Sequence, residues 1–170
     1  MTRIIGLDPG LRHTGWGVIE AAPHRLTFVA CGTIDGGPVG PLAERLTAIY
    51  DALVAIIAEL APAEAAIEET VVNVNASSSL KLGHARGVIV LAAARAGLVV
   101  AEYASKMVKR AVTGTGAAPK TQVAAMVRML LPGAGEVGAD AADALAVAIC
   151  HAHRRTTLAR IAGAAVGSRA

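Results

Sequence analysis

Short apolar runs early in the chain predict β-strands separated by turns. We expect strands over residues 3–8, 15–20 and 25–30, and the last two are close enough in sequence to form a hairpin. From residue 42 to residue 60, leucine and isoleucine recur at the spacing of an amphipathic helix. Residues 65–68 (AAIE) form a fourth strand, which is too apolar for the edge of a sheet.

The rest of the chain predicts one further strand among several helices. Helices are expected over 77–96, 104–112, 119–130 and 139–153, with a strand over 98–103. Three strands followed by alternating helices and strands indicate an α/β domain with a mixed sheet. We expect one domain over 1–155 and a basic, flexible tail over 156–170, where Ala and Gly alternate with scattered Arg.

Composition excludes several classes of protein. Hydrophobic residues make up 54% and charged residues 17% of the 170 residues, which excludes a disordered chain. No uncharged apolar run approaches the roughly 18 residues that a membrane span needs, so we expect no membrane association. The amino terminus has no secretory signal pattern, and we therefore expect a cytoplasmic protein with Cys31 and Cys150 as reduced thiols.

Charge is distributed unevenly along the chain. Residues 81–128 carry a net charge of +7 and residues 151–170 carry +4, whereas the remaining residues carry −8. A basic segment of this kind suits a surface that binds a polyanion such as nucleic acid, but an ordinary solvated face explains it equally well. The acidic remainder requires a separate explanation.

Four carboxylates of this acidic remainder are candidates for one site. Asp8 ends the first strand, Glu68 ends the fourth, and Asp140 and Asp143 lie three residues apart on one helix. Each alone fits a turn, a solvated strand end or a helix start. Together, at the ends of apolar segments, they would repel one another unless cations neutralised them. Oxygen ligands favour Mg²⁺ or Mn²⁺, and two such ions beside a basic segment indicate phosphodiester hydrolysis.

Histidines near these acids are less suitable as ligands. His151 lies eleven residues beyond Asp140, about 16.5 Å along a helix, which is too far for one metal site. We expect His151 and His153 to be cations at a helix end or contacts to phosphate. His13 follows Asp8 closely, and we expect it in a surface loop.

Four segments resemble the RuvC family of Holliday-junction resolvases. They are residues 6–17 (GLDPGLRHTGWG), 66–69 (AIEE), 80–87 (LKLGHARG) and 139–146 (ADAADALA), in the family's order and at its spacings. The resemblance runs from about residue 3 to residue 153. It implies a ribonuclease H-like fold, a five-stranded mixed sheet flanked by helices.

The resemblance also implies an activity and its partners. Family members are homodimers that cut four-way DNA junctions by paired symmetric nicks in recombination and repair, together with the RuvA–RuvB branch-migration complex. Asp8, Glu68, Asp140 and Asp143 match the family's catalytic acids, which hold two Mg²⁺ ions per site, with Mn²⁺ as a substitute. The candidates for DNA binding are Lys109 and Lys120, which match family lysines, together with Lys81 and Arg86 in the basic segment.

One position departs from the family pattern, and three other functions stay open. Val71 stands where the family usually carries an aromatic residue that contacts junction bases, and valine cannot stack on a base. A junction-binding protein without catalysis is therefore one alternative. A nuclease of the same fold acting on structured RNA is a second. The third is a fragment of an actin-like ATPase or kinase, because Asp8, Gly10 and Gly15 also resemble a phosphate loop.

Overall fold

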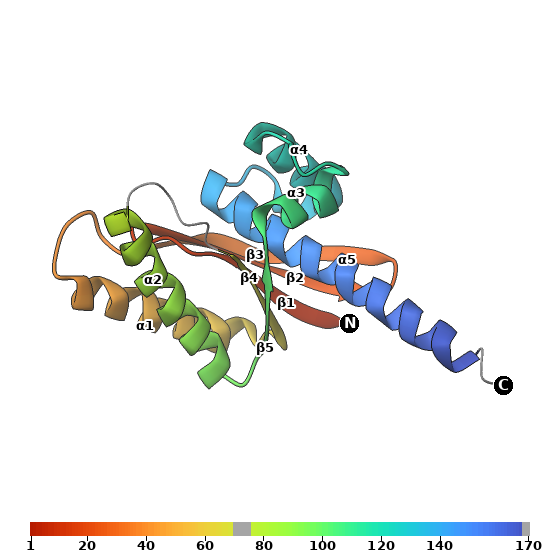
Figure 1. Ribbon diagram of the computed structural model, residues 1–170, viewed down its shortest axis with the longest axis horizontal. Coiled ribbons are helices and arrows are strands. Elements are labelled where there is room, and N and C mark those ends of the chain that lie inside the picture. Colours follow the sequence, from red (N-terminus) through yellow and green to blue (C-terminus); the bar gives the residue numbers. More distant parts are fainter. Residues whose placement is uncertain (70–75, 168–170) are drawn as a thin grey trace.

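The computed structural model describes residues 1–69 and 76–167, except for the side chains of residue 156 and residues 158–167. As predicted, three strands are followed by alternating helices and strands and then by further helices (Figure 1). The strands are β1 (Thr2–Asp8), β2 (His13–Ala22), β3 (Arg25–Asp35), β4 (Glu64–Glu68) and β5 (Val99–Tyr103). The helices are α1 (Leu42–Leu60), α2 (Ala76–Arg95), α3 (Ser105–Thr113), α4 (Lys120–Leu130), a 3₁₀ turn (Pro132–Ala134) and α5 (Ala139–Gly167).

The strands form one mixed sheet in the order β3-β2-β1-β4-β5. The first three strands pair antiparallel, whereas β4 lies parallel to both β1 and β5. This arrangement confirms the predicted five-stranded mixed sheet, and it confirms that the apolar β4 is an interior strand. Because β1 and β4 are parallel neighbours, their carboxyl ends lie at the same edge of the sheet.

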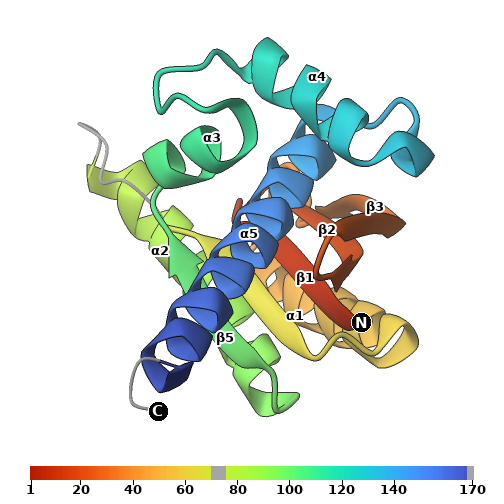
Figure 2. The ribbon, with the colours of Figure 1, turned by 90° about the vertical axis from the view of Figure 1, so that its right-hand side faces the viewer.

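Helices cover both faces of the sheet and give the fold three layers. The helices α1 and α2 pack on one face, and α5, flanked by α3 and α4, packs on the other (Figures 1 and 2). Ile4 and Ile5 are both fully buried, and they belong to the apolar cores on opposite sides of the sheet. The continuous apolar run of β1 therefore follows from burial on both faces.

Two glycines allow α5 to approach the backbone of the sheet. A Cβ on Gly6 would lie 2.1 Å from the carbonyl oxygen of Ala144, and a Cβ on Gly15 would lie 2.0 Å from that of Asp140. Any side chain at these two positions would push the helix away from the sheet. The start of α5 is thereby held against β1 and β2, close to the end of β1.

Several elements extend beyond their predicted limits. The β2–β3 hairpin pairs from Ala22 and Arg25 to His13 and Asp35, because its register continues past an irregularity at Val18 and Ile19. The helix predicted over 139–153 continues to Gly167, in a stretch rich in helix-forming alanine. The flexible character of residues 156–170 stays a prediction. In the described part of the chain, no helix is long and apolar enough to cross a membrane, and Cys31 and Cys150 are free thiols.

Candidate active site

The two strand-end acids lie side by side. Leu7 of β1 pairs with Ile67 of β4 in parallel register, so Asp8 and Glu68 follow at the next step of the two strands. Both side chains are partly buried and line one cavity of about 150 Å³. The sequence-based expectation that these two carboxylates meet is therefore confirmed by the register of the sheet.

The helix α5 brings the other two acids to the same place. Asp143 lines the cavity together with Asp8 and Glu68. Asp140 does not line it, but its backbone lies against Gly15, which is the antiparallel partner of Asp8. The charges of Asp140 and Asp143 both raise the pKa of Asp8. The structure thus gathers all four predicted acids around the end of β1.

Burial and mutual repulsion change the acidity of these groups. The pKa of Asp8 rises from 3.8 to about 7, first because of burial and then because of the charges of Glu68 and Asp143. Burial also raises the pKa of Glu68, while a hydrogen bond from the Ser105 hydroxyl lowers it. A cation bound among these carboxylates would relieve the repulsion.

Ser105 is a site residue that sequence reasoning missed. It lines the cavity and donates its side-chain hydrogen bond to Glu68. Its place could have been inferred from the chain order. The parallel register pairs Glu68 with Tyr103, and Ser105 follows Tyr103 by two residues, at the start of α3.

Two of the predicted DNA-binding lysines lie at the same cavity. Lys109 of α3 and Lys120 of α4 both line it. The Lys120 Nζ donates to the Asp143 Oδ2 at 2.6 Å, although the lysine side chain is 75% exposed and the aspartate is 18% exposed. An ion pair with so exposed a partner holds its geometry weakly, so Lys120 is free to turn toward a phosphate.

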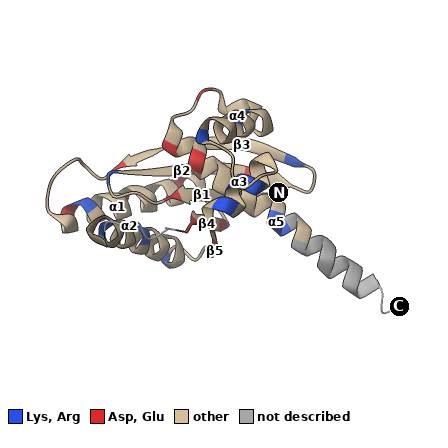
Figure 3. Ribbon diagram, turned by 45° about the horizontal axis from the view of Figure 1, so that its top comes forward, with Lys and Arg blue, Asp and Glu red and all other residues tan. Residues whose placement is uncertain are grey.

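The other candidate DNA contacts lie away from the acids. Lys81 and Arg86 are on α2, where Lys81 is exposed and Arg86 forms an ion pair with Glu102 of β5. In Figure 3, basic segments are visible on both α2 and α3. Val71 lies outside the described residues. A role of Lys81, Arg86 and Val71 in DNA binding stays a prediction.

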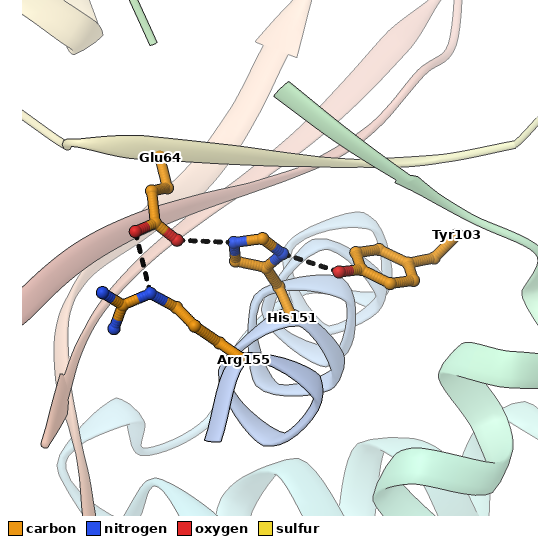
Figure 4. Close-up of polar contacts among 4 residues, drawn as sticks. All are labelled: Glu64, Tyr103, His151 and Arg155. Atoms are coloured by element: carbon orange, nitrogen blue, oxygen red, sulfur yellow. Dashed lines mark hydrogen bonds and ion pairs between the residues drawn. The ribbon is translucent and has the colours of Figure 1, made fainter. Parts of the chain in front are cut away.

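The expectation for His151 is wrong. The residue is only 7% exposed, and its Nδ1 lies 2.7 Å from the hydroxyl of Tyr103. Its Nε2 lies 2.7 Å from the Glu64 Oε2, and the Arg155 Nε lies 2.8 Å from the Glu64 Oε1 (Figure 4). His151 is therefore buried in the interior of α5 rather than placed at a helix end, because α5 turns this face onto the sheet. His153 is exposed, and its Nδ1 lies 3.2 Å from the carbonyl oxygen of Ala111.

The donor set of the cavity suits a hard divalent cation. Asp8, Glu68 and Asp143 offer carboxylate oxygens alone, which is the ligand type that Mg²⁺ and Mn²⁺ prefer. Within residues 1–69 and 76–167, no three His, Cys, Asp or Glu side chains form a preassembled metal-ligand group. The Asp143 carboxylate is instead paired with Lys120. Asp8, Glu68 and Asp143 would hold such a cation if their carboxylates moved closer together.

Comparison with known proteins places this arrangement in a family. Residues 4–151 match the family model described as crossover junction endodeoxyribonuclease RuvC. Proteins of that name from Paramagnetospirillum magneticum and Acidiphilium cryptum are 57% and 60% identical to the chain, each over 162 residues. These alignments cover 95% of this chain and 98% and 97% of the relatives.

A solved structure agrees with these matches. The structure of T. thermophilus RuvC in complex with Holliday junction substrate is 31% identical, with a TM-score of 0.85, and the superposition covers 92% of this chain and 96% of that one. The ribonuclease H-like fold that the motifs imply is thereby confirmed. With a family model matched over most of its length and relatives above 50% identity, the chain belongs to the RuvC family of crossover junction endodeoxyribonucleases.

Proposed function

We propose that this protein is a nuclease that resolves four-way DNA junctions by hydrolysing phosphodiester bonds at the cavity of Asp8, Glu68 and Asp143. The observation that carries the proposal is the meeting of these acids with Lys109 and Lys120 in one cavity of a RuvC-family chain. The relative of known structure was solved with a Holliday junction, which supports the same class of substrate.

The acids are the proposed ligands of a divalent metal. RuvC-family nucleases depend on a metal, and we assign Mg²⁺ here, as two ions per site, with Mn²⁺ able to substitute. Asp8, Glu68, Asp140 and Asp143 would hold these ions, and the pKa of about 7 at Asp8 marks the point where charge neutralisation is most needed. Bound Mg²⁺ supplies a Lewis acid that activates water and stabilises the leaving oxygen.

The lysines are assigned to the phosphates of the DNA. Lys120, highly exposed and paired with Asp143, can exchange this carboxylate for a phosphate when Asp143 turns toward a cation. Lys109 lines the same cavity from α3 and is placed to hold the backbone beside the scissile bond. Ser105 donates its hydrogen bond to Glu68 and keeps this carboxylate oriented toward the cavity.

A junction with two-fold symmetry needs two identical sites, which a homodimer supplies. We propose the exposed face of α2 as the dimer contact. Leu80 and Leu91 lie three helical turns apart on this helix and are 64% and 53% exposed. A Cβ added at Gly87, between them, would meet nothing within 4 Å. We further propose the RuvA–RuvB complex as a functional partner and the cytoplasm as the location.

The test of the proposed chemistry is a pair of isosteric substitutions. Asp8→Asn and Glu68→Gln should abolish cleavage of a synthetic junction in Mg²⁺ while junction binding persists. Glu69→Gln is the matched control, because Glu69 is an exposed neighbour of Glu68, and it should cleave like the wild type. If both site variants lose junction binding together with cleavage, the acids serve the fold rather than the reaction.

A further inference from the structure

A chain of polar contacts crosses the otherwise apolar interface between α5 and the sheet. Figure 4 shows His151 between Tyr103 of β5 and Glu64 of β4. Both contacts of the imidazole measure 2.7 Å. Tyr103 and His151 are 6% and 7% exposed, and the side chain of Glu64 is 16% exposed. We call the three residues the His151 bridge. Arg155, on the next turn of α5, contacts the second oxygen of Glu64 from the solvent side.

The rest of the interface between α5 and the sheet is apolar, and Leu145 of the helix lies against Gly17 of β2. Ala144 and Ala148, both buried, lie against Gly6 of β1. These contacts set how closely α5 approaches the sheet, whereas apolar attraction itself has no preferred direction along the helix axis. Hydrogen bonds of the length seen at His151 are directional and tolerate little displacement.

Both α5 and β4 carry one residue of the His151 bridge and one acid of the cavity. The two residues are separated by a similar distance on each element. Asp143 precedes His151 by eight residues of helix, which is about 12 Å. Glu68 follows Glu64 by four residues of strand, which is about 13 Å. A contact between His151 and Glu64 at one end therefore sets how far Asp143 reaches toward Glu68 at the other. Tyr103 extends the bridge to β5, and the parallel register of β4 and β5 pairs Tyr103 with Glu68.

We propose that His151 is a positioning residue, which holds the acids of α5 in register with those of β1 and β4. The proposal rests on the metal-dependent function assigned above to the four acids. His151 itself does not reach the cavity, since it is absent from the residues that line it. Its effect on the reaction is transmitted through the axial position of α5.

Both bonds of the bridge can form in either charge state of the imidazole. The Glu64 carboxylate, which also accepts from Arg155, accepts from the Nε2–H. When the ring is neutral, Nδ1 accepts from the Tyr103 hydroxyl, and when it is charged, Nδ1–H donates to the Tyr103 oxygen. Burial raises the pKa of Tyr103, which keeps this hydroxyl protonated.

The test compares three variants of α5. His151→Phe keeps a ring of similar size and removes both bonds, whereas His151→Gln keeps a donor for Glu64. Cys150→Ala is the matched control, because Cys150 is a buried neighbour on the same turn that takes no part in the bridge. The readouts are kcat and KM for junction cleavage, the affinity for Mn²⁺ alone measured by electron paramagnetic resonance, and the melting temperature.

We expect His151→Phe to lower kcat about tenfold to a hundredfold with KM little changed, as small misplacements of catalytic groups do. The same variant should bind Mn²⁺ more weakly. His151→Gln should recover part of the loss in kcat and part of the loss in Mn²⁺ affinity. Cys150→Ala should keep the wild-type kcat and Mn²⁺ affinity at a melting temperature comparable to that of the His151 variants. Unchanged kcat and Mn²⁺ affinity in folded His151→Phe, or equal losses in Cys150→Ala, would overturn the proposal.

A second variant keeps the test decisive if His151→Phe does not fold. Tyr103→Phe removes one hydroxyl, leaves the ring in place, and should show a smaller loss in the same direction. If the wild-type protein binds Mn²⁺ but cleaves no junction, the proposed function fails, while the Mn²⁺ affinities still decide the role of His151. Equal Mn²⁺ affinity in Tyr103→Phe and the wild type would count against the bridge.

Discussion

The raised pKa of Asp8 predicts that the active site destabilises the metal-free protein at neutral and basic pH. The Asp8 carboxyl has a pKa of about 7 in the folded chain against 3.8 for the ordinary group. Between these two values the folded state binds more protons than the unfolded state, so the free energy of unfolding falls as the pH rises from about 4 to about 7. Well below pH 4 the Asp8 carboxyl is protonated in both states and does not affect the free energy of unfolding.

The magnitude follows from the difference between the two pKa values. At about 1.4 kcal/mol per pKa unit, ionising the folded Asp8 costs up to about 4 kcal/mol. Asp8→Asn replaces the carboxylate with a neutral group of the same shape. In a chain of this length each kcal/mol shifts the melting temperature by about 2–4 °C, so the metal-free variant should melt up to roughly 8–16 °C higher at pH 8.

The assay is thermal unfolding in EDTA at pH 4 and pH 8. Asp8→Asn should be clearly more stable than the wild type at pH 8 and nearly equal to it at pH 4, whereas Asp51→Asn, at an exposed position of α1, should match the wild type at both. Adding Mg²⁺ at pH 8 should raise the melting temperature of the wild type more than that of Asp8→Asn, because bound cations stabilise the folded state. An Asp8→Asn variant that is no more stable at pH 8, or whose gain is the same at both pH values, would refute this reasoning.

Three further substitutions test other parts of the site. Lys109→Ala should weaken junction binding and reduce the slope of log K against log salt by about one, and an unchanged slope would remove Lys109 from the interface. Ser105→Ala removes a hydrogen bond that lowers the pKa of Glu68, so the acidic limb of the pH–rate profile should move to higher pH; an unmoved limb would argue against the contact. Gly15→Ala places a Cβ 2.0 Å from the Asp140 carbonyl oxygen, so chemical denaturation should show a loss of a few kcal/mol, and wild-type stability would contradict the close approach.

The strand-end acids could be predicted because the information that places them is local. Asp8 and Glu68 each end an apolar run, and parallel pairing of two buried strands brings such ends together. The spacing of Asp140 and Asp143 likewise puts both on one helix. Their meeting with the strand acids required only that this helix begin at the same edge of the sheet.

The features that sequence reasoning missed depend on how distant elements pack. The pairing of Lys120 with Asp143 requires α4 to lie beside α5, which no periodicity in either helix specifies. The spacing between His151 and Asp140 correctly keeps His151 away from the acids. It does not reveal that this face of α5 lies on β4 and β5, where Glu64 and Tyr103 provide partners.

Resolution of four-way junctions by this protein is tested by a cleavage assay on a synthetic mobile junction. Linear duplex DNA and a structured RNA serve as competing substrates, and each reaction is run with Mg²⁺ and with Ca²⁺. We expect paired symmetric nicks in the junction alone, with Mg²⁺ and not with Ca²⁺. Cleavage of linear duplex or RNA as rapidly as of the junction, or no metal-dependent cleavage of any substrate, would contradict it.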